Sequence, residues 1–145
     1  MSSSAAKLVS IVEDDDATRE GLVEFLRNHQ FAVLAASTSA SALEMLHRGL
    51  EPSVILLDLM MPGLNGWDFR RLQMADARLQ NIPVVVMTAM GVASDSTRAQ
   101  LGEVTWLTKP FDVDALVKAL TDVSPRGDRP RQDFARFADR QADGS

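Results

Sequence analysis

The feature that most constrains the fold is an alternation of five short apolar runs with five amphipathic helical patterns. Strands that alternate with helices are typical of βαβ units and of a parallel sheet. We therefore predict an α/β fold in which helices cover a parallel sheet. The runs that we interpret as strands are residues 8–12, 31–35, 54–57, 84–87 and 104–107.

The later helical patterns differ in strength. The third pattern has three apolar residues on one side, namely Phe69, Leu72 and Ala75. The fourth, at about 94–101, has few apolar side chains to anchor it, so we expect it to be held loosely. The fifth has apolar side chains at helical spacing and follows Asp112, a residue type that is favoured at the N-cap.

Composition limits the class of protein. With 145 residues, of which 46% are hydrophobic, the chain has the size and apolar content of one globular domain. It has no cysteine, which excludes disulfides and thiolate metal sites. No apolar run approaches the length of a transmembrane helix, and the N-terminal residues do not form a signal peptide, so we expect a cytoplasmic protein.

The charge of the chain is unevenly distributed. The net charge is −5, and the last 22 residues contain five Arg and four Asp, so the rest of the chain carries −6. Such an acidic body offers no basic surface for a nucleic-acid backbone. Acidic side chains at the ends of strands are better suited to a divalent cation.

Polar side chains follow four of the predicted strands. Glu13 and Asp14 follow the first, and Asp58 follows the third. Thr88 follows the fourth and Lys109 the fifth. The carboxyl ends of parallel strands share one edge of the sheet, where ligands bind in open α/β proteins. Clustered carboxylates repel each other unless a cation such as Mg²⁺ intervenes, so this set predicts a receptor for a phosphoryl group beside a carboxylate nucleophile.

Four motifs, in this order, resemble those of the receiver domain of two-component response regulators. They are VEDD at 12–15, LDLMMPGLNG at 57–66, MTA at 87–89 and WLTKPF at 106–111. The resemblance implies a doubly wound, flavodoxin-like fold with five parallel strands in the order 2-1-3-4-5. We expect the receiver domain to span residues 7–123, followed by a tail at 124–145 that is flexible or forms a short helix.

The resemblance assigns the chemistry to acidic residues. Asp58 would accept a phosphoryl group from a sensor histidine kinase or a phosphotransfer protein. Asp14 and Asp58 would bind Mg²⁺ directly, and Glu13 would bind it through water. The main-chain carbonyl of Met60 would be a further ligand. The domain would be a switch and not an enzyme, with at most slow self-dephosphorylation.

The resemblance also assigns the response to phosphorylation. Lys109 would pair with Asp58 and then with the phosphoryl oxygens, and the bond from Lys109 to Pro110 would be cis. Thr88 would move toward the phosphoryl group, and Trp106 would follow it inward. The face made by the fourth helix, fifth strand and fifth helix would then change its preference for a downstream protein or for a second copy of the chain. We expect no direct contact with nucleic acid or membrane.

Three residues depart from the family pattern. Trp106 stands where the family usually has Tyr or Phe. Met60 and Met90 stand where members often have polar residues that influence the attack of water on the phosphoryl group. Because a thioether orients water poorly, we predict a long-lived phosphorylated state.

Two other functions are compatible with parts of the sequence. Residues 14–18 also form D-x-D-x-T, which resembles the haloacid-dehalogenase phosphatases, with Asp14 as nucleophile and Asp16 as general acid. That hypothesis gives Asp58 no role and lacks a second acidic pair on a later strand. The other alternative is an interaction module of the same fold that works without phosphorylation, against which the complete acidic set argues. For the receiver domain itself, we expect a stand-alone regulator or the receiver piece of a longer protein.

Overall fold

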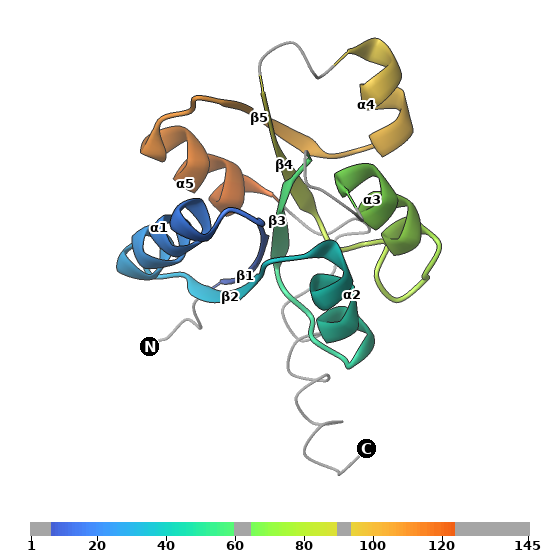
Figure 1. The fold of residues 1–145 in the computed structure, drawn as a ribbon, viewed down its shortest axis with the longest axis horizontal. Helices are drawn as coiled ribbons and strands as arrows, with labels where there is room; N and C mark the ends of the chain where they lie inside the picture. The colour runs from blue at the N-terminus through green and yellow to red at the C-terminus, as the bar shows by residue number, and fades with distance from the viewer. Residues whose placement is uncertain (1–6, 60–64, 90–93, 124–145) are drawn as a thin grey trace.

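The structure is a computed structural model, and it describes residues 7–59, 65–89 and 94–123. Within these ranges, five strands form one sheet that is covered by five helices (Figure 1). The elements in chain order are β1 (Leu8–Val12), α1 (Asp16–Asn28), β2 (Ala32–Ala36), α2 (Ser39–His47), β3 (Val54–Asp58), α3 (Gly66–Met74), β4 (Val84–Ala89), α4 (Asp95–Leu101), β5 (Thr105–Lys109) and α5 (Val113–Asp122).

The sheet has the predicted topology. All neighbouring strands are parallel, and their order is β2-β1-β3-β4-β5. Val12 at the end of β1 lies beside Leu57 on β3, and Asp58 lies beside Met87 on β4. The carboxyl ends of the central strands are therefore level with one another at one edge of the sheet.

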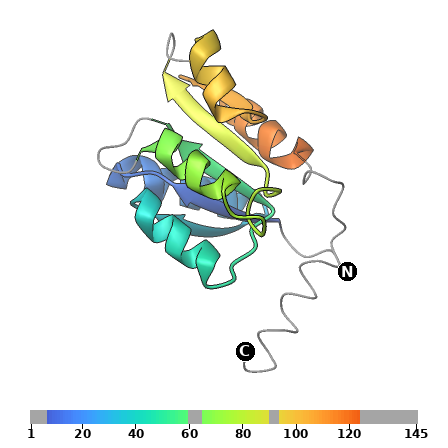
Figure 2. The ribbon, with the colours of Figure 1, turned by 90° about the vertical axis from the view of Figure 1, so that its right-hand side faces the viewer.

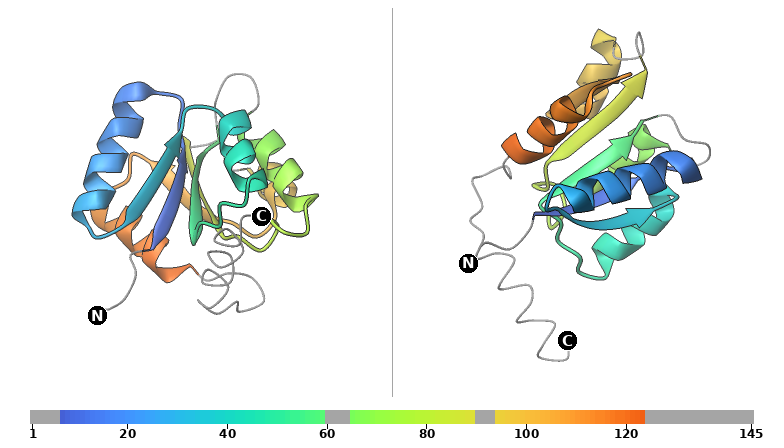
Figure 3. Two further views of the ribbon diagram at one scale, coloured as in Figure 1. Left: turned by 90° about the horizontal axis from the view of Figure 1, so that it is seen from below. Right: turned by 90° about the vertical axis from the view of Figure 1, so that its left-hand side faces the viewer.

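The helices form a layer on each face of the sheet. Figures 1 and 3 show α1 and α5 on one face and α2, α3 and α4 on the other. Figure 2 looks onto the second face and shows α3 between α2 and α4. Each face has its own apolar core, and all five residues of β3 are buried between the two. Each fully buried Val, Leu or Ile side chain stabilises the fold by about 2 kcal/mol.

Three strands extend beyond the apolar runs that predicted them and include polar residues. β3 includes Asp58, β4 continues to Ala89 and β5 continues to Lys109. Main-chain pairing continues after the apolar side chains end, so Asp58, Thr88 and Lys109 occupy strand positions instead of loops. The remaining boundaries agree to within one residue, and Asp112 caps α5 as predicted by accepting a hydrogen bond from the Ala115 N–H at 2.7 Å.

The predicted apolar side of α3 is wrong in part. Phe69 is buried, but Leu72 is 41% exposed and Ala75 is also exposed. Arg70 and Gln73 point into the protein in their place and are fully buried or nearly so. The prediction from amphipathic spacing failed here because this face of α3 packs against main-chain carbonyl groups that need hydrogen-bond donors.

Arg70 and Gln73 supply those donors. The Arg70 guanidinium donates to the carbonyl of Leu101, the last residue of α4, at 2.8 Å and to that of Glu103 at 3.1 Å. It also donates to Oε1 of Gln73 at 2.8 Å. The Gln73 amide in turn donates to two carbonyls between α3 and β4, those of Leu79 and Ile82. This network attaches the C-terminal end of α4 to the body of the domain.

Several predictions concern residues outside the described ranges. These residues are Met60, Met90 and the tail at 124–145. The further metal ligand, the long-lived phosphorylated state and the form of the tail therefore stay predictions. In the part of the chain that the structure describes, no helix has both the length and the apolar character needed to cross a bilayer.

Candidate functional site

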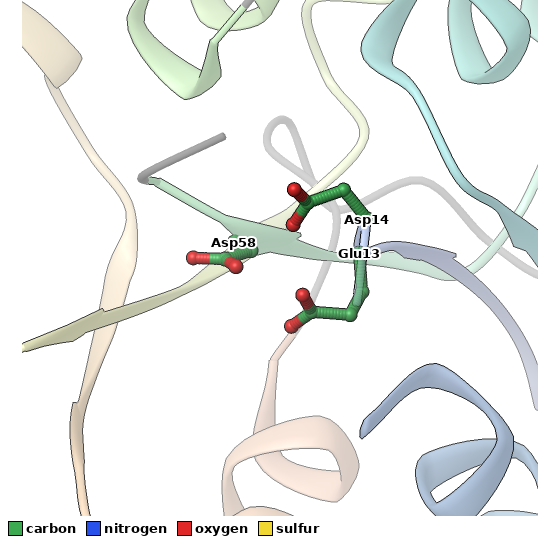
Figure 4. A group of neighbouring side chains, drawn as sticks. All are labelled: Glu13, Asp14 and Asp58. Carbon is green, nitrogen blue, oxygen red and sulfur yellow. The ribbon is translucent and has the colours of Figure 1, made fainter. Parts of the chain in front are cut away.

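Three acidic residues converge at the carboxyl edge of the sheet. Glu13 and Asp14 directly follow β1, and Asp58 is the last residue of β3. One carboxylate oxygen from each lies within 4.8 Å of the other two. Figure 4 shows the carboxyl groups of Glu13 and Asp14 on either side of the end of β1, both turned toward the side of Asp58. Glu13 and Asp58 are 2% and 6% exposed, whereas Asp14 is exposed, so two buried acids form the floor of the site and one forms its rim.

Lys109 brings a positive charge to the same place. Its Nζ lies 3.7 Å from Oδ2 of Asp58 and 3.8 Å from Oε1 of Glu13. Both distances are those of ion pairs and are too long for hydrogen bonds. The peptide bond between Lys109 and Pro110 is cis, which is the isomer implied by the resemblance. The cluster has three carboxyl groups and one ammonium group, so it retains excess negative charge when the acids are ionised.

The pKa of Glu13 reflects its burial and, to a lesser extent, that excess charge. Burial, together with the nearby Asp58 carboxylate, raises the pKa of Glu13 to about 7. The N–H of Asp15, which donates to Oε2 of Glu13 at 3.1 Å, and the ammonium of Lys109 oppose this rise only in part. Among the described residues, Oε1 of Glu13 is buried and has no hydrogen-bond partner. A buried carboxylate oxygen without a donor calls for a cation or a water.

This donor set fits Mg²⁺. Magnesium prefers oxygen ligands, keeps several waters and is usually held by one or two carboxylates. Asp14 and Asp58 can supply direct ligands, and the unpartnered oxygen of Glu13 can accept a hydrogen bond from a bound water. The cluster is therefore of the kind that holds magnesium in receiver domains.

The expected switch residues lie on the two strands beyond Asp58. Thr88 on β4 is buried, and its hydroxyl donates to the carbonyl of Ala89 at 3.5 Å, the outer limit of a hydrogen bond. Trp106 on β5 is half-buried against the core on the side of α2, α3 and α4. The guanidinium of Arg98 on α4 lies over the Trp106 ring, 4.9 Å from its centroid. A cation at this distance interacts favourably with the ring face.

Two of the four acids that follow β1 serve the loop itself. Asp15 is the N-cap of α1 and accepts a hydrogen bond from the Thr18 N–H at 2.9 Å. Asp16 is 81% exposed and pairs with Arg19 at 2.6 Å. Asp16 is therefore engaged on the surface of α1, which weakens the hypothesis that it acts as the general acid of a phosphatase.

Sequence reasoning missed two arginines near the site, Arg19 and Arg98. The spacing of Arg19 three residues after Asp16 is a signal for a helical ion pair, but it does not reveal contacts to the preceding loop. The contact of Arg98 with Trp106 joins two elements that are separate in the sequence and has no local signal.

Comparison with known proteins supports the fold and identifies a family. Residues 9–121 match the family model of the response regulator receiver domain. Protein PilH of Pseudomonas aeruginosa is 33% identical over 116 residues, which are 79% of this chain and 95% of PilH. Response regulator Rre1 of Synechocystis sp. is 36% identical over 108 residues, which are 73% of this chain. These residues are 46% of Rre1, so the chain spans about half the length of that relative.

A solved structure gives the same result. The CheY-like response regulator receiver domain protein of Methanospirillum hungatei is 32% identical, with a TM-score of 0.66, over 79% of this chain and 92% of that one. The strand order, the acidic cluster and these matches lead to one conclusion. The chain belongs to the response regulator receiver domains of two-component signalling, a family of phosphoacceptor switches and not of catalytic enzymes.

Proposed function

We propose that Asp58 accepts a phosphoryl group from a histidine kinase or a phosphotransfer protein in a magnesium-dependent reaction. The modification then changes what the face made by α4, β5 and α5 binds. The observation that carries this proposal is the convergence of charges on one carboxylate. Asp58 lies with two other acids, within 4.8 Å of both, and 3.7 Å from the ammonium of Lys109.

The residues of the site supply positioning and charge. A carboxylate oxygen of Asp58 attacks phosphorus, the phosphorus–nitrogen bond to the donor imidazole breaks, and the imidazole takes up a proton. Lys109 neutralises charge on the transferred oxygens, which is the main requirement of phosphoryl transfer. Asp14 and Asp58 would hold Mg²⁺ directly and Glu13 would hold it through a water, and the bound metal would supply the remaining positive charge.

The response to phosphorylation involves Thr88 on β4 and Trp106 on β5, the two strands beyond Asp58. The Thr88 hydroxyl makes a long hydrogen bond to Ala89, which it can give up to turn toward a phosphoryl oxygen. Trp106, on the neighbouring strand, moves into the space that Thr88 leaves. A phosphoryl group adds a dianion with strong hydrogen-bond acceptors, and such a change shifts a two-state element. The downstream target is a protein or a second copy of the chain.

Chemical phosphorylation tests the acceptor. With acetyl phosphate and Mg²⁺, the intact mass should increase by one phosphoryl group, and a chelator should prevent the increase. Asp58→Asn should abolish labelling, whereas Asp114→Asn, in the exposed first turn of α5, should leave it intact. Labelling that persists in Asp58→Asn refutes the proposal. Removal of the donor then tests the predicted long lifetime, which loss of the label within seconds would contradict.

A phosphotransfer profile tests the donor. Purified histidine kinases and phosphotransfer proteins of the source organism are phosphorylated and mixed with the chain at short times. One donor should label Asp58 much faster than the others. Equal slow labelling by every donor would contradict a dedicated histidine kinase or phosphotransfer partner.

A further inference from the structure

The loop between β1 and α1 is held by one arginine side chain from the first turns of α1. Nη1 of Arg19 donates to the main-chain carbonyl of Glu13 at 3.0 Å and to that of Asp14 at 3.4 Å. Nη2 donates to Oδ1 of Asp16 at 2.6 Å. The side chain is only 18% exposed, so it lies against the loop instead of extending into solvent. A planar guanidinium that makes several such bonds has little freedom to move.

The two carbonyls that Arg19 binds belong to the peptide groups on either side of the Asp14 Cα. Their orientations define the backbone dihedral angles of Asp14, and these angles determine where its side chain points. Glu13, by contrast, is fixed by burial and by the N–H of Asp15. Asp14 is the exposed member of the acidic cluster and depends on the loop for its orientation.

We propose that Arg19 is a positioning residue of the magnesium site, which orders the loop so that the Asp14 carboxylate faces Asp58. This inference rests on the proposed function because it requires that the cluster binds Mg²⁺. Arg19 touches neither the metal nor the phosphoryl group. It acts through the main chain of Glu13 and Asp14.

Charge and positioning predict opposite effects for this residue. A fixed positive charge close to the cluster repels a divalent cation, so electrostatics alone predicts that removal of the Arg19 charge strengthens magnesium binding. Loss of a positioning contact predicts weaker binding, because Asp14 must then be ordered when the metal binds. Changes to groups that orient metal ligands typically weaken binding by about 10- to 100-fold. The sign of the change therefore separates the two explanations.

Magnesium titration of two variants provides the test. Arg19→Gln removes the charge, and Arg19→Lys keeps the charge but cannot bridge two carbonyls and a carboxylate. Binding of Mg²⁺ alone is followed by calorimetry and by tryptophan fluorescence. We expect the dissociation constant to rise about tenfold in both variants. The matched control is Arg27→Gln, in the last turn of the same helix, which should change it by less than about twofold.

A second readout does not involve the metal. Hydrogen exchange of the amides of residues 13–18, measured without Mg²⁺, should be faster in both Arg19 variants and unchanged in Arg27→Gln. If wild-type protein binds Mg²⁺ and Arg19→Gln binds it equally or more tightly, the positioning role of Arg19 is overturned while the proposed function stands. If the wild type itself does not bind Mg²⁺, the proposed function fails, and this inference fails with it.

Discussion

The two sides of the site are built in different ways. The acidic cluster of Glu13, Asp14 and Asp58 is carried by β1 and β3, which have a neighbouring strand on both edges. All five residues of β3 are buried. The switch side, which we define as Thr88, Trp106 and α4, lies toward the edge strand β5, where only Leu107 is buried. α4 has seven residues, of which Leu101 is the buried one.

This difference places stability where the chemistry needs it. The acids must keep their positions for the metal and for the incoming phosphoryl group. The central strands hold the two buried acids, Glu13 and Asp58, at little risk of local opening. The response needs an element that moves at small energetic cost, and α4 has few buried side chains to oppose movement. It has a firm attachment at its C-terminal end, through Arg70, and a weaker one along its length, where Arg98 lies over Trp106.

Removal of Arg70 is the strongest test of this division. Arg70→Met fills similar space but leaves the buried carbonyl of Leu101 and that of Glu103 without this donor. We expect the free energy of unfolding to fall by about 3 kcal/mol, measured by urea denaturation. The affinity for magnesium should remain unchanged, because the acidic cluster lies at the ends of β1 and β3 and not on α3 or α4.

The neighbouring residue provides the control for this change. Arg71→Met also removes one guanidinium from α3, but Arg71 is exposed and pairs with Asp68 on the surface. Arg71→Met should lower the free energy of unfolding by less than about 0.5 kcal/mol. A loss below about 1 kcal/mol in Arg70→Met, or a weaker magnesium site, would show that the two sides are not divided in this way.

The pH dependence of stability tests the acidic side. The pKa of Glu13 is raised from its ordinary value of 4.5 to about 7, so between these values the folded protein binds more protons than the unfolded chain. The contribution of Glu13 to stability without metal is therefore greatest below this window and is lost as pH rises through it. We expect Glu13 to contribute a loss of about 2 kcal/mol between about pH 5 and about pH 8, measured by urea denaturation at each pH.

Two variants and one ligand check this prediction. Glu13→Gln should remove most of the decrease, whereas Glu44→Gln, which changes an exposed carboxyl on α2, should leave it in place. Saturating Mg²⁺ should also reduce it, because the metal stabilises the charged carboxylate. If the stability of Glu13→Gln decreases by the same amount as pH rises, groups other than Glu13 cause the decrease.

The acidic cluster was predictable because its members share one simple property. Glu13, Asp14 and Asp58 each lie at the end of an apolar run, and parallel strands bring such ends to one edge. The order of the strands came from the family resemblance, since apolar runs alone do not determine which strands are neighbours. The ends of β3, β4 and β5 were underestimated because main-chain pairing does not depend on apolar side chains.

The buried polar residues of α3 were not predictable in the same way. Charged side chains are rarely fully buried, so amphipathic spacing assigns Arg70 to the surface and Leu72 to the core. The structure reverses both assignments, because the main-chain partners of Arg70 are carbonyls more than 30 residues later in the chain. Such a pairing depends on tertiary contacts between α3 and the end of α4, about which local periodicity carries no information.

The smallest expected effect concerns the weaker attachment of α4. Arg98→Gln removes the cation over the Trp106 ring, an interaction worth about 1 kcal/mol at a partly exposed site. We expect hydrogen exchange of the α4 amides to become about fivefold faster. Exchange in β3 should not change, because its residues are buried between the two cores. The emission of Trp106, measured in a Trp67→Phe background, should shift as the ring loses its partner.

The control for this change lies on the same helix, and the position of the effect along α4 is informative. Gln100→Ala alters another exposed side chain of α4 and should leave both exchange and emission as they are. In Arg98→Gln, the faster exchange should be greatest in the first turn of α4 and least near Leu101, which Arg70 continues to hold. Uniformly faster exchange through α4 and β5 would mean that the Arg98 contact supports the whole edge of the sheet. The Arg70 contacts would then not hold the C-terminal end of α4 independently.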